Sequence, residues 1–313
     1  MPIEEGADRI VGQCLSVRKG EHVLIIADME RKAVGEAIFH SARKVEAVPV
    51  LAIIPPRERA AQEPPDPLAK LMLECEVIVL ATGTSMTHTM ARVRATKAGA
   101  RIASLPGVTE EAMSEGGITA DYREIDRVLG IMARKLRNAR KVHVTSGGGT
   151  DATFTVKGRE WITQDTGLAA RRGEVTTLPA GEVFVAPVEE TAEGRLVFDV
   201  RLRDPVTQPA TLILSKGCAT RVVGARSAVE EMNRGGKEGR NLGKFGIGLN
   251  PRARPNGPIV EAQKALGAVH VVFGGSAPFG GKIDCDVRVD GIMTGATVEI
   301  DGKLLLERGR LPA

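Results

Sequence analysis

The chain has 313 residues, 42% hydrophobic and 26% charged, a composition typical of globular domains with sizeable cores. The 43 Lys and Arg exceed the 39 Asp and Glu by only four, and aromatic residues are scarce at 3%, which argues against a nucleic-acid-binding protein. Four cysteines without paired spacing, an acidic start and no long apolar run predict a cytoplasmic protein with reduced thiols, no signal peptide and no membrane helix.

The first 140 residues predict a Rossmann-like domain. Short apolar runs without alternation are typical of strands buried on both faces of a parallel sheet, and four occur at 22–28, 48–54, 75–83 and 100–107. The stretches between and after them predict helices at 30–45, 85–99 and 121–139. No glycine fingerprint follows the first run, so we do not expect a dinucleotide cofactor here.

The loop after the third run, "ATGTSMTHT" (81–89), lies where open α/β sheets form a crevice. Thr84 or Ser85 is expected to cap the following helix, with His88 in its first turn. A hydrogen-bonded surface histidine is the ordinary interpretation, and a role at an interface is the alternative. A nucleophilic pair of Ser85 and His88 is not expected, because no third group would orient it.

Residues 141–313 predict a second, mainly antiparallel α+β domain. Alternating strands and glycine turns replace the earlier pattern, as in "GEVFVAP" (181–187) and "TVEIDGKLLLERG" (297–309), and helices are expected at 225–236 and 258–267. The predicted fold class is therefore α/β, with a parallel-sheet domain at 1–140 and a β-rich domain at 141–313 that carries the site.

Four segments of this second half each combine an apolar strand with a charged or imidazole group. They supply five candidate site residues, which are Glu182, Lys244, His270, Arg288 and Asp290. The spacing of two places Arg288 and Asp290 on one face of a strand. A single histidine in an apolar strand is usually a core residue, but four such segments together indicate a site.

These segments resemble the metal-dependent aminopeptidases of the aminopeptidase T/S type and the related 2,5-dihydroxypyridine dioxygenases. The resemblance covers nearly the whole chain, including "SMTHTMARVRATKAGARIASLPG", "GEVFVAP", "GKFGIGLNP", "KALGAVHVVFGG" and "VDGIMTGATVEIDGK". For the fold, it implies the two-domain arrangement described above. For assembly, it implies a homodimer whose subunits together shape the cavity.

The resemblance also implies a ligand set, from which this chain departs. Glu182, His270 and Asp290 match metal ligands of the peptidases, whereas Lys244 stands in place of a glutamate and Arg288 in place of a histidine. The dioxygenases bind one iron through two histidines and an aspartate, so the matching set would be His270, Arg288 and Asp290. A tyrosine of the peptidases is replaced by Ala277.

Lys244 and Arg288 oppose a metal ion at this position. Neither ammonium nor guanidinium is a metal ligand at neutral pH, and a divalent ion about 5 Å from one such charge is opposed by roughly 7 kcal/mol at an effective dielectric of about 20. We therefore predict a remodelled site in which Lys244 and Arg288 pair with Glu182 and Asp290.

The alternative is a single zinc, manganese, cobalt or iron ion on Glu182, His270 and Asp290. In that arrangement Asp284 or Asp286 would assist, and Lys244 would point away from the ion.

Three functions follow from this interpretation. The first is an aminopeptidase-like hydrolase of a peptide or small amide bond, with Glu182, Lys244, His270, Arg288 and Asp290 as its catalytic groups. The second is a ring-opening dioxygenase or hydrolase on a small anionic heterocycle, with Arg288 holding a carboxylate. The third is a non-catalytic descendant that binds an anion. The expected partner is a small molecule or short peptide.

Overall fold

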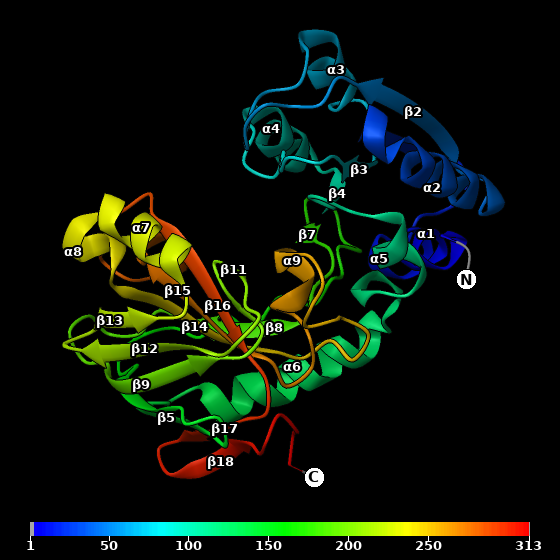
Figure 1. Cartoon of the computed structure of the whole chain (residues 1–313). Coiled ribbons are helices and arrows are strands. Elements are labelled where there is room, and N and C mark those ends of the chain that lie inside the picture. Colours follow the sequence, from blue (N-terminus) through cyan, green and yellow to red (C-terminus); the bar gives the residue numbers. More distant parts are fainter. Residues whose placement is uncertain (1–2, 313) are drawn as a thin grey trace. The chain divides into compact units, whose positions relative to one another are not determined.

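The computed structural model describes residues 3–312, and the chain divides into two compact units (Figure 1). The first unit comprises Met1–Asp126, Asp165–Gly181 and Pro251–Ala253, and the second comprises Arg127–Gln164, Glu182–Asn250 and Arg254–Ala313. The division at residue 140 expected from the sequence therefore falls inside the second unit. Two later segments return to the first unit.

The first unit contains a five-stranded parallel sheet in the order β2-β1-β3-β4-β7. Its strands are β1 (His22–Asp28), β2 (Val48–Ile54), β3 (Val77–Ala81), β4 (Arg101–Ser104) and β7 (Val175–Thr177). The first four match the apolar runs of the sequence. The fifth, β7, comes from the returning segment 165–181, and the sequence pattern did not predict it.

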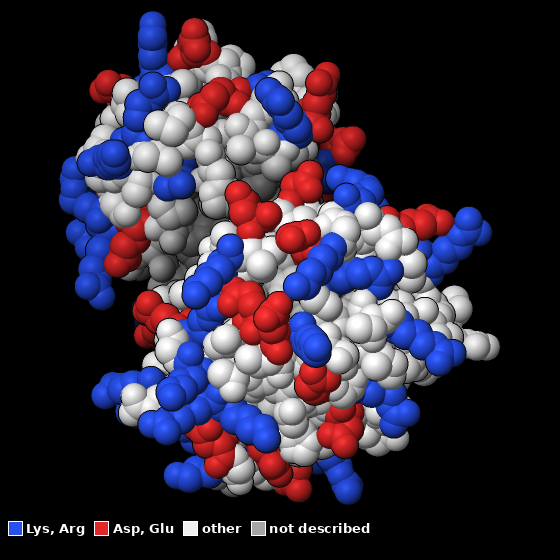
Figure 2. Space-filling model, turned by 90° about the vertical axis from the view of Figure 1, so that its left-hand side faces the viewer, with Lys and Arg blue, Asp and Glu red and all other residues white. Residues whose placement is uncertain are grey.

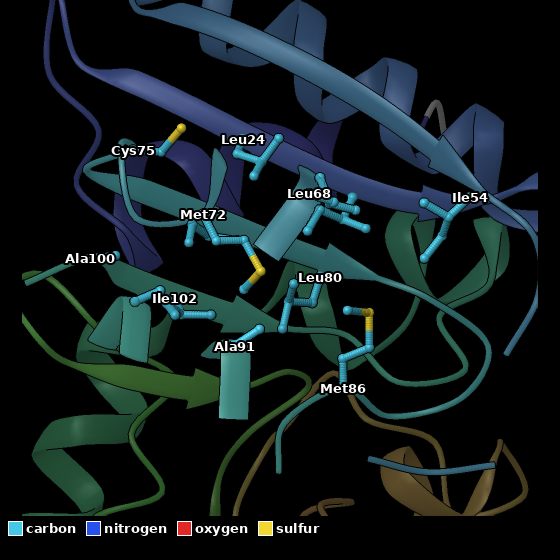
Figure 3. Packing of buried hydrophobic residues seen from close by; sticks show 13 residues of the cluster. Leu24, Ile54, Leu68, Met72, Cys75, Leu80, Met86, Ala91, Ala100 and Ile102 are labelled. Carbon is cyan, nitrogen blue, oxygen red and sulfur yellow. The ribbon is translucent and has the colours of Figure 1, made fainter. Parts of the chain in front are cut away.

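Helices precede and connect the strands of this unit. They are α1 (Glu4–Asp8), η1 (Arg9–Cys14), η2 (Met29–Arg31), α2 (Lys32–Lys44), α3 (Asp66–Leu71), α4 (Met90–Ala98), α5 (Glu110–Ser114) and η3 (Gly117–Thr119), and α6 (Tyr122–Leu136) continues into the second unit. Side chains of β1 and β3, such as Leu24 and Leu80, pack with Leu68 and Met72 from α3 and the segment after it (Figure 3). Burying such side chains contributes about 1.5–3 kcal/mol each.

Helix α4 begins later than the sequence predicted. Its N-cap is Thr89, whose side chain accepts a hydrogen bond from the backbone N–H of Arg92, and not Thr84 or Ser85. The hydroxyl of Ser85 instead donates a hydrogen bond to the Thr87 hydroxyl (2.9 Å), within the loop that precedes the helix. His88 consequently lies before the helix and is exposed.

The second unit contains two antiparallel sheets. The six-stranded sheet has the order β11-β10-β16-β15-β14-β8, and the seven-stranded sheet has the order β13-β12-β9-β6-β5-β17-β18. The strands of the first are β8 (Glu182–Val185), β10 (Arg201–Leu202), β11 (Asp204–Pro205), β14 (Leu242–Gly248), β15 (Val269–Gly274) and β16 (Arg288–Met293). The strands of the second are β5 (Lys141–Ser146), β6 (Asp151–Thr155), β9 (Glu193–Phe198), β12 (Ala210–Ser215), β13 (Cys218–Val223), β17 (Ala296–Ile300) and β18 (Lys303–Leu306).

Short helices complete this unit, namely α7 (Arg226–Arg234), α8 (Gly236–Gly239), α9 (Ile259–Ala262) and η4 (Ala277–Phe279). The helix predicted at 258–267 is only one turn long, because the N–H of Leu266 donates to Asn250 and does not continue the helix. The predicted α/β class with a parallel and an antiparallel part is confirmed.

None of the helices described has the length and apolar composition needed to span a membrane. Lys and Arg side chains occur together with Asp and Glu side chains on the face seen in Figure 2.

Candidate functional site

The five predicted site residues lie on four neighbouring strands of the six-stranded sheet. The register pairs Gly248 with Glu182, Lys244 with Val272, Gly246 with His270, and Val272 with Asp290. Residues directly opposite each other project to the same face, and residues two apart on a strand do so as well. Glu182, Lys244, His270, Arg288 and Asp290 therefore all project from one face of the sheet.

Glu182 is the centre of this cluster. Its side chain is 5% exposed and accepts hydrogen bonds from Lys244 Nζ at 3.0 Å (Oε1) and 3.1 Å (Oε2). Lys264 Nζ donates to Oε1 at 2.7 Å. A carboxylate enclosed in this way remains ionised, because two ammonium groups offset the cost of removing it from water.

His270 completes the surroundings of Glu182. Its ring is fully buried, and Nε2 lies 2.6 Å from Glu182 Oε2, although the ring is not aligned for a well-formed hydrogen bond and Nδ1 has no partner among the described residues. The ring lies over Gly246, where a Cβ would come within 2.3 Å of His270 Cε1 and 2.4 Å of Nε2. The glycine in "FGIG" is thus needed to make room for the imidazole.

Electrostatics fixes the protonation of the cluster. Burial lowers the pKa of His270 to about 4, with the Lys244 charge adding to the effect, so the ring is neutral at pH 7. Burial alone would raise the pKa of Glu182, but Lys244, Lys264 and His270 together hold it well below its usual range. Burial also lowers the pKa of Lys244, and the Glu182 charge limits that shift.

A second carboxylate, Asp290, has partners of its own. Arg288 donates to it through two nitrogens, Nε to Oδ2 at 3.0 Å and Nη2 to Oδ1 at 2.8 Å. Gln263 Nε2 donates to Oδ1 at 2.6 Å. The Asp290 side chain is 14% exposed and that of Arg288 is 50% exposed, so this ion pair forms the solvent side of the cluster.

Two aromatic rings border the cations. Lys244 Nζ lies 4.1 Å from the ring centroid of Phe184 and 5.5 Å from that of Phe279, and Arg288 Cζ lies 6.0 Å from the Phe279 centroid. The two rings meet edge to face at 6.0 Å. Cations over ring faces at these distances are favourable, and both phenylalanines are partly exposed.

Two members of this cluster, Gln263 and Lys264, were not predicted from the sequence. Both belong to the short segment between α9 and β15 that was expected to be helical, where neither residue stands out. Asp284 and Asp286, the predicted accessory ligands, are exposed, and Asp286 lies 3.7 Å from Arg234 instead. They lie in a segment that forms no strand until Arg288.

The donor set does not fit a metal ion. Within residues 3–312, no group of three or more His, Cys, Asp and Glu side chains is arranged to hold one. All four carboxylate oxygens of Glu182 and Asp290 already face an ammonium, guanidinium, amide or imidazole nitrogen. Binding an ion would place it among Lys244, Lys264 and Arg288, which cannot act as ligands while charged.

Comparison with known proteins identifies a family whose model matches nearly the whole chain. The family model described as NicX: 2,5-dihydroxypyridine 5,6-dioxygenase matches residues 9–313. A 2,5-dihydroxypyridine 5,6-dioxygenase of Pseudomonas putida KT2440 is 26% identical over 198 residues. That alignment covers 57% of this chain and 56% of the Pseudomonas protein, so it spans little more than half of the relative.

Two solved structures share the fold. The 2,5-dihydroxypyridine dioxygenase from Pseudomonas putida KT2440 superposes with a TM-score of 0.77 at 20% identity, covering 99% of this chain and 97% of that one. Wild-type AmpT from Thermus thermophilus gives a TM-score of 0.67 at 18% identity, with 99% of both chains covered. At these identities the likeness shows a common fold alone. The relationship to the aminopeptidases expected from the sequence is thus supported only as a distant one.

Proposed function

We propose, from the premise that this chain belongs to the 2,5-dihydroxypyridine 5,6-dioxygenase family, that it binds and converts a small heteroaromatic anion at the cluster around Glu182. The family favours the ring-opening function, the second of the three expected from the sequence, over the aminopeptidase-like hydrolysis that came first. The whole reaction of the Pseudomonas relative is part of this proposal, because the alignment spans only 56% of that protein.

One observation carries the proposal: the half-exposed guanidinium of Arg288 and two partly exposed aromatic rings lie close together beside a buried polar cluster. Phe184 and Phe279 are partly exposed, and the cationic groups of Lys244 and Arg288 lie 4.1 to 6.0 Å from their ring centroids. A planar anion bound there would meet ring edges or faces and donors for its charged oxygen.

The buried groups would then set the electrostatic field beneath the ligand without contacting it. Glu182 is an ionised acceptor, and neutral His270 carries beside it an Nδ1 without a partner among the described residues. Arg288 is the group best placed to contact an anion from solvent, since half of its side chain is exposed. The homodimer, the cytoplasmic location and the small-molecule partner remain predictions within this proposal.

Calorimetric titration with 2,5-dihydroxypyridine tests the binding step, and oxygen consumption with the same compound tests conversion. We expect saturable binding that weakens roughly two- to tenfold in Phe279→Leu, because loss of one aromatic contact costs roughly 0.5–1.5 kcal/mol. Phe39→Leu is the matched control, since Phe39 lies on α2 in the first unit and should leave binding unchanged.

Other outcomes would distinguish the remaining functions. Binding without oxygen uptake or product would indicate the non-catalytic anion-binding descendant. Release of leucine from a leucyl arylamide, with no binding of 2,5-dihydroxypyridine, would instead support the aminopeptidase-like hydrolase.

A further inference from the structure

We infer that Lys244 and Arg288 take the place of a divalent metal in this site, so that the half-exposed guanidinium of Arg288, with the buried Lys244 charge beside it, holds the ligand's anionic oxygens without a metal ion. The inference uses the proposed function only for the identity of the ligand. The statement about the metal rests on the arrangement of the cluster itself.

The carboxylate oxygens are fully engaged. Glu182 Oε1 accepts from Lys244 and Lys264, and Oε2 lies between Lys244 and His270. Asp290 Oδ1 accepts from Arg288 and Gln263, while Oδ2 accepts from Arg288. A metal on Glu182, His270 and Asp290 would have to replace charge-assisted hydrogen bonds on both acids.

Lys244 is held in place from several sides. Its side chain is 4% exposed, and β14 lies between β8 and β15 in the sheet. Its ammonium contacts both Glu182 oxygens and lies over the Phe184 ring. Swinging it aside for an ion would break a buried ion pair and leave a cation without its carboxylate, which is strongly unfavourable.

His270 cannot compensate for these losses. Its Nε2 lies 2.6 Å from Glu182 Oε2, although neither ring nitrogen makes a well-formed hydrogen bond among the described residues, so only Nδ1 would be open to an ion. A single imidazole nitrogen is far from the three or four ligands that zinc or iron sites use. The site therefore offers an anion the half-exposed guanidinium of Arg288 and offers a cation almost no vacant ligand.

Replacing the metal by Lys244 and Arg288 changes how the site would recognise the charge of a ligand. A metal would bind an anionic oxygen by coordination, whereas Arg288 offers a planar pair of N–H donors that suits a carboxylate or two neighbouring oxygens. The predicted ligand class is thus a planar aromatic compound with one anionic group, bound equally well with and without a chelator.

Metal analysis of the purified protein tests the inference directly. Protein prepared without chelators should contain well under one zinc, manganese, cobalt or iron per chain, and calorimetric titration with Zn²⁺, Mn²⁺ or anaerobic Fe²⁺ should give no stoichiometric binding. The double variant Lys244→Glu/Arg288→His removes two cations and adds two potential ligands. Its affinity for at least one of these ions should rise by about 100-fold or more.

A charge-matched variant controls for the change in net charge. Lys237→Glu/Arg226→His alters two exposed residues of the same unit, at 71% and 93% side-chain exposure, and should gain no metal affinity. Circular dichroism establishes whether each variant is folded. If the double variant does not fold, Arg288→His alone retains the buried ion pair at Lys244 and should gain a smaller, measurable affinity.

Two results would overturn the inference. One is stoichiometric metal in the wild type that remains bound after dialysis. The other is the absence of any gain in metal affinity in the variants of Lys244 and Arg288 that fold. Binding of 2,5-dihydroxypyridine is measured separately with and without EDTA. Loss of binding in EDTA contradicts the inference, whereas absence of binding in both conditions contradicts only the proposed function.

Discussion

Two buried carboxylates, one in each unit, are stabilised in different ways. Asp28, at the end of β1, is 1% exposed and accepts from the backbone N–H groups of Gly83 (2.6 Å) and Arg31 (3.1 Å). The Arg31 guanidinium adds a longer contact of 3.4 Å. Glu182, in contrast, is surrounded by the side chains of Lys244, Lys264 and His270.

The difference separates a structural carboxylate from a site. Backbone N–H groups are supplied by the fold itself, so Asp28 ties the loop after β3 to the end of β1. Glu182 depends on ionised side chains from distant parts of the sequence, and each of them loses rotamer freedom and hydration to be there. Such a cluster is not needed for folding, because apolar residues of similar size would pack as well.

The largest expected effect is the removal of the Glu182 charge. Glu182→Gln leaves Lys244 buried beside a neutral amide, and we expect a loss of about 3–5 kcal/mol in the free energy of unfolding. Adding Lys244→Met should restore much of the lost free energy of unfolding, since the buried ammonium without a carboxylate partner is then removed. Denaturant titration measures both. A loss below about 1 kcal/mol in the single variant would mean that the ion pair is not buried in solution.

The next largest effect is the dependence of the free energy of unfolding on pH. It concerns the Glu182 cluster, to which His270 belongs. Its pKa is lowered from 6.5 to about 4, so below pH 6.5 the unfolded chain binds a proton that the folded chain does not. Stability therefore falls as the pH drops from 6.5 towards 4, by up to roughly 3 kcal/mol. Glu182, whose pKa is held low, adds a further loss under more acidic conditions.

Unfolding followed from pH 7 to pH 4 checks this dependence. His270→Gln should flatten the curve in that range, whereas His88→Gln, which alters an exposed histidine of the first unit, should leave the curve unchanged. Parallel curves for the wild type and His270→Gln would show that the imidazole is not kept neutral.

The strands of both regions could be predicted well from the sequence, for a physical reason. Strands buried on both faces read as continuous apolar runs, and β1 to β4 follow these runs closely. The residues of the Glu182 cluster could be brought together from the sequence because a charged group stands out within such a strand. The two-residue period of a strand also places Arg288 and Asp290 on one face, where their side chains form an ion pair.

The parts that were missed depend on long-range pairing. Gln263 and Lys264 lie in a segment whose helix ends early, and their partners Asp290 and Glu182 are distant in sequence. Strand β7 is three residues long and pairs with β4 from a returning segment, which no local pattern reveals. The capping residue of α4 was misplaced because Thr84, Ser85 and Thr89 are all acceptable caps in sequence.

The smallest expected effect is at Asp28, and it sharpens the contrast with Glu182. Asp28→Asn leaves one oxygen to serve both the Gly83 N–H and Arg31, so one donor loses its partner, and we expect a cost of about 1–2 kcal/mol. Because Asp28 belongs to the first unit and not to the Glu182 cluster, the variant should keep the affinity of the wild type for 2,5-dihydroxypyridine. Denaturant titration at pH 7 and calorimetry of the ligand measure the two quantities. A weakened ligand affinity in folded Asp28→Asn would show that the loop after β3 takes part in the site, and the separation between a structural carboxylate and a functional one would then be wrong.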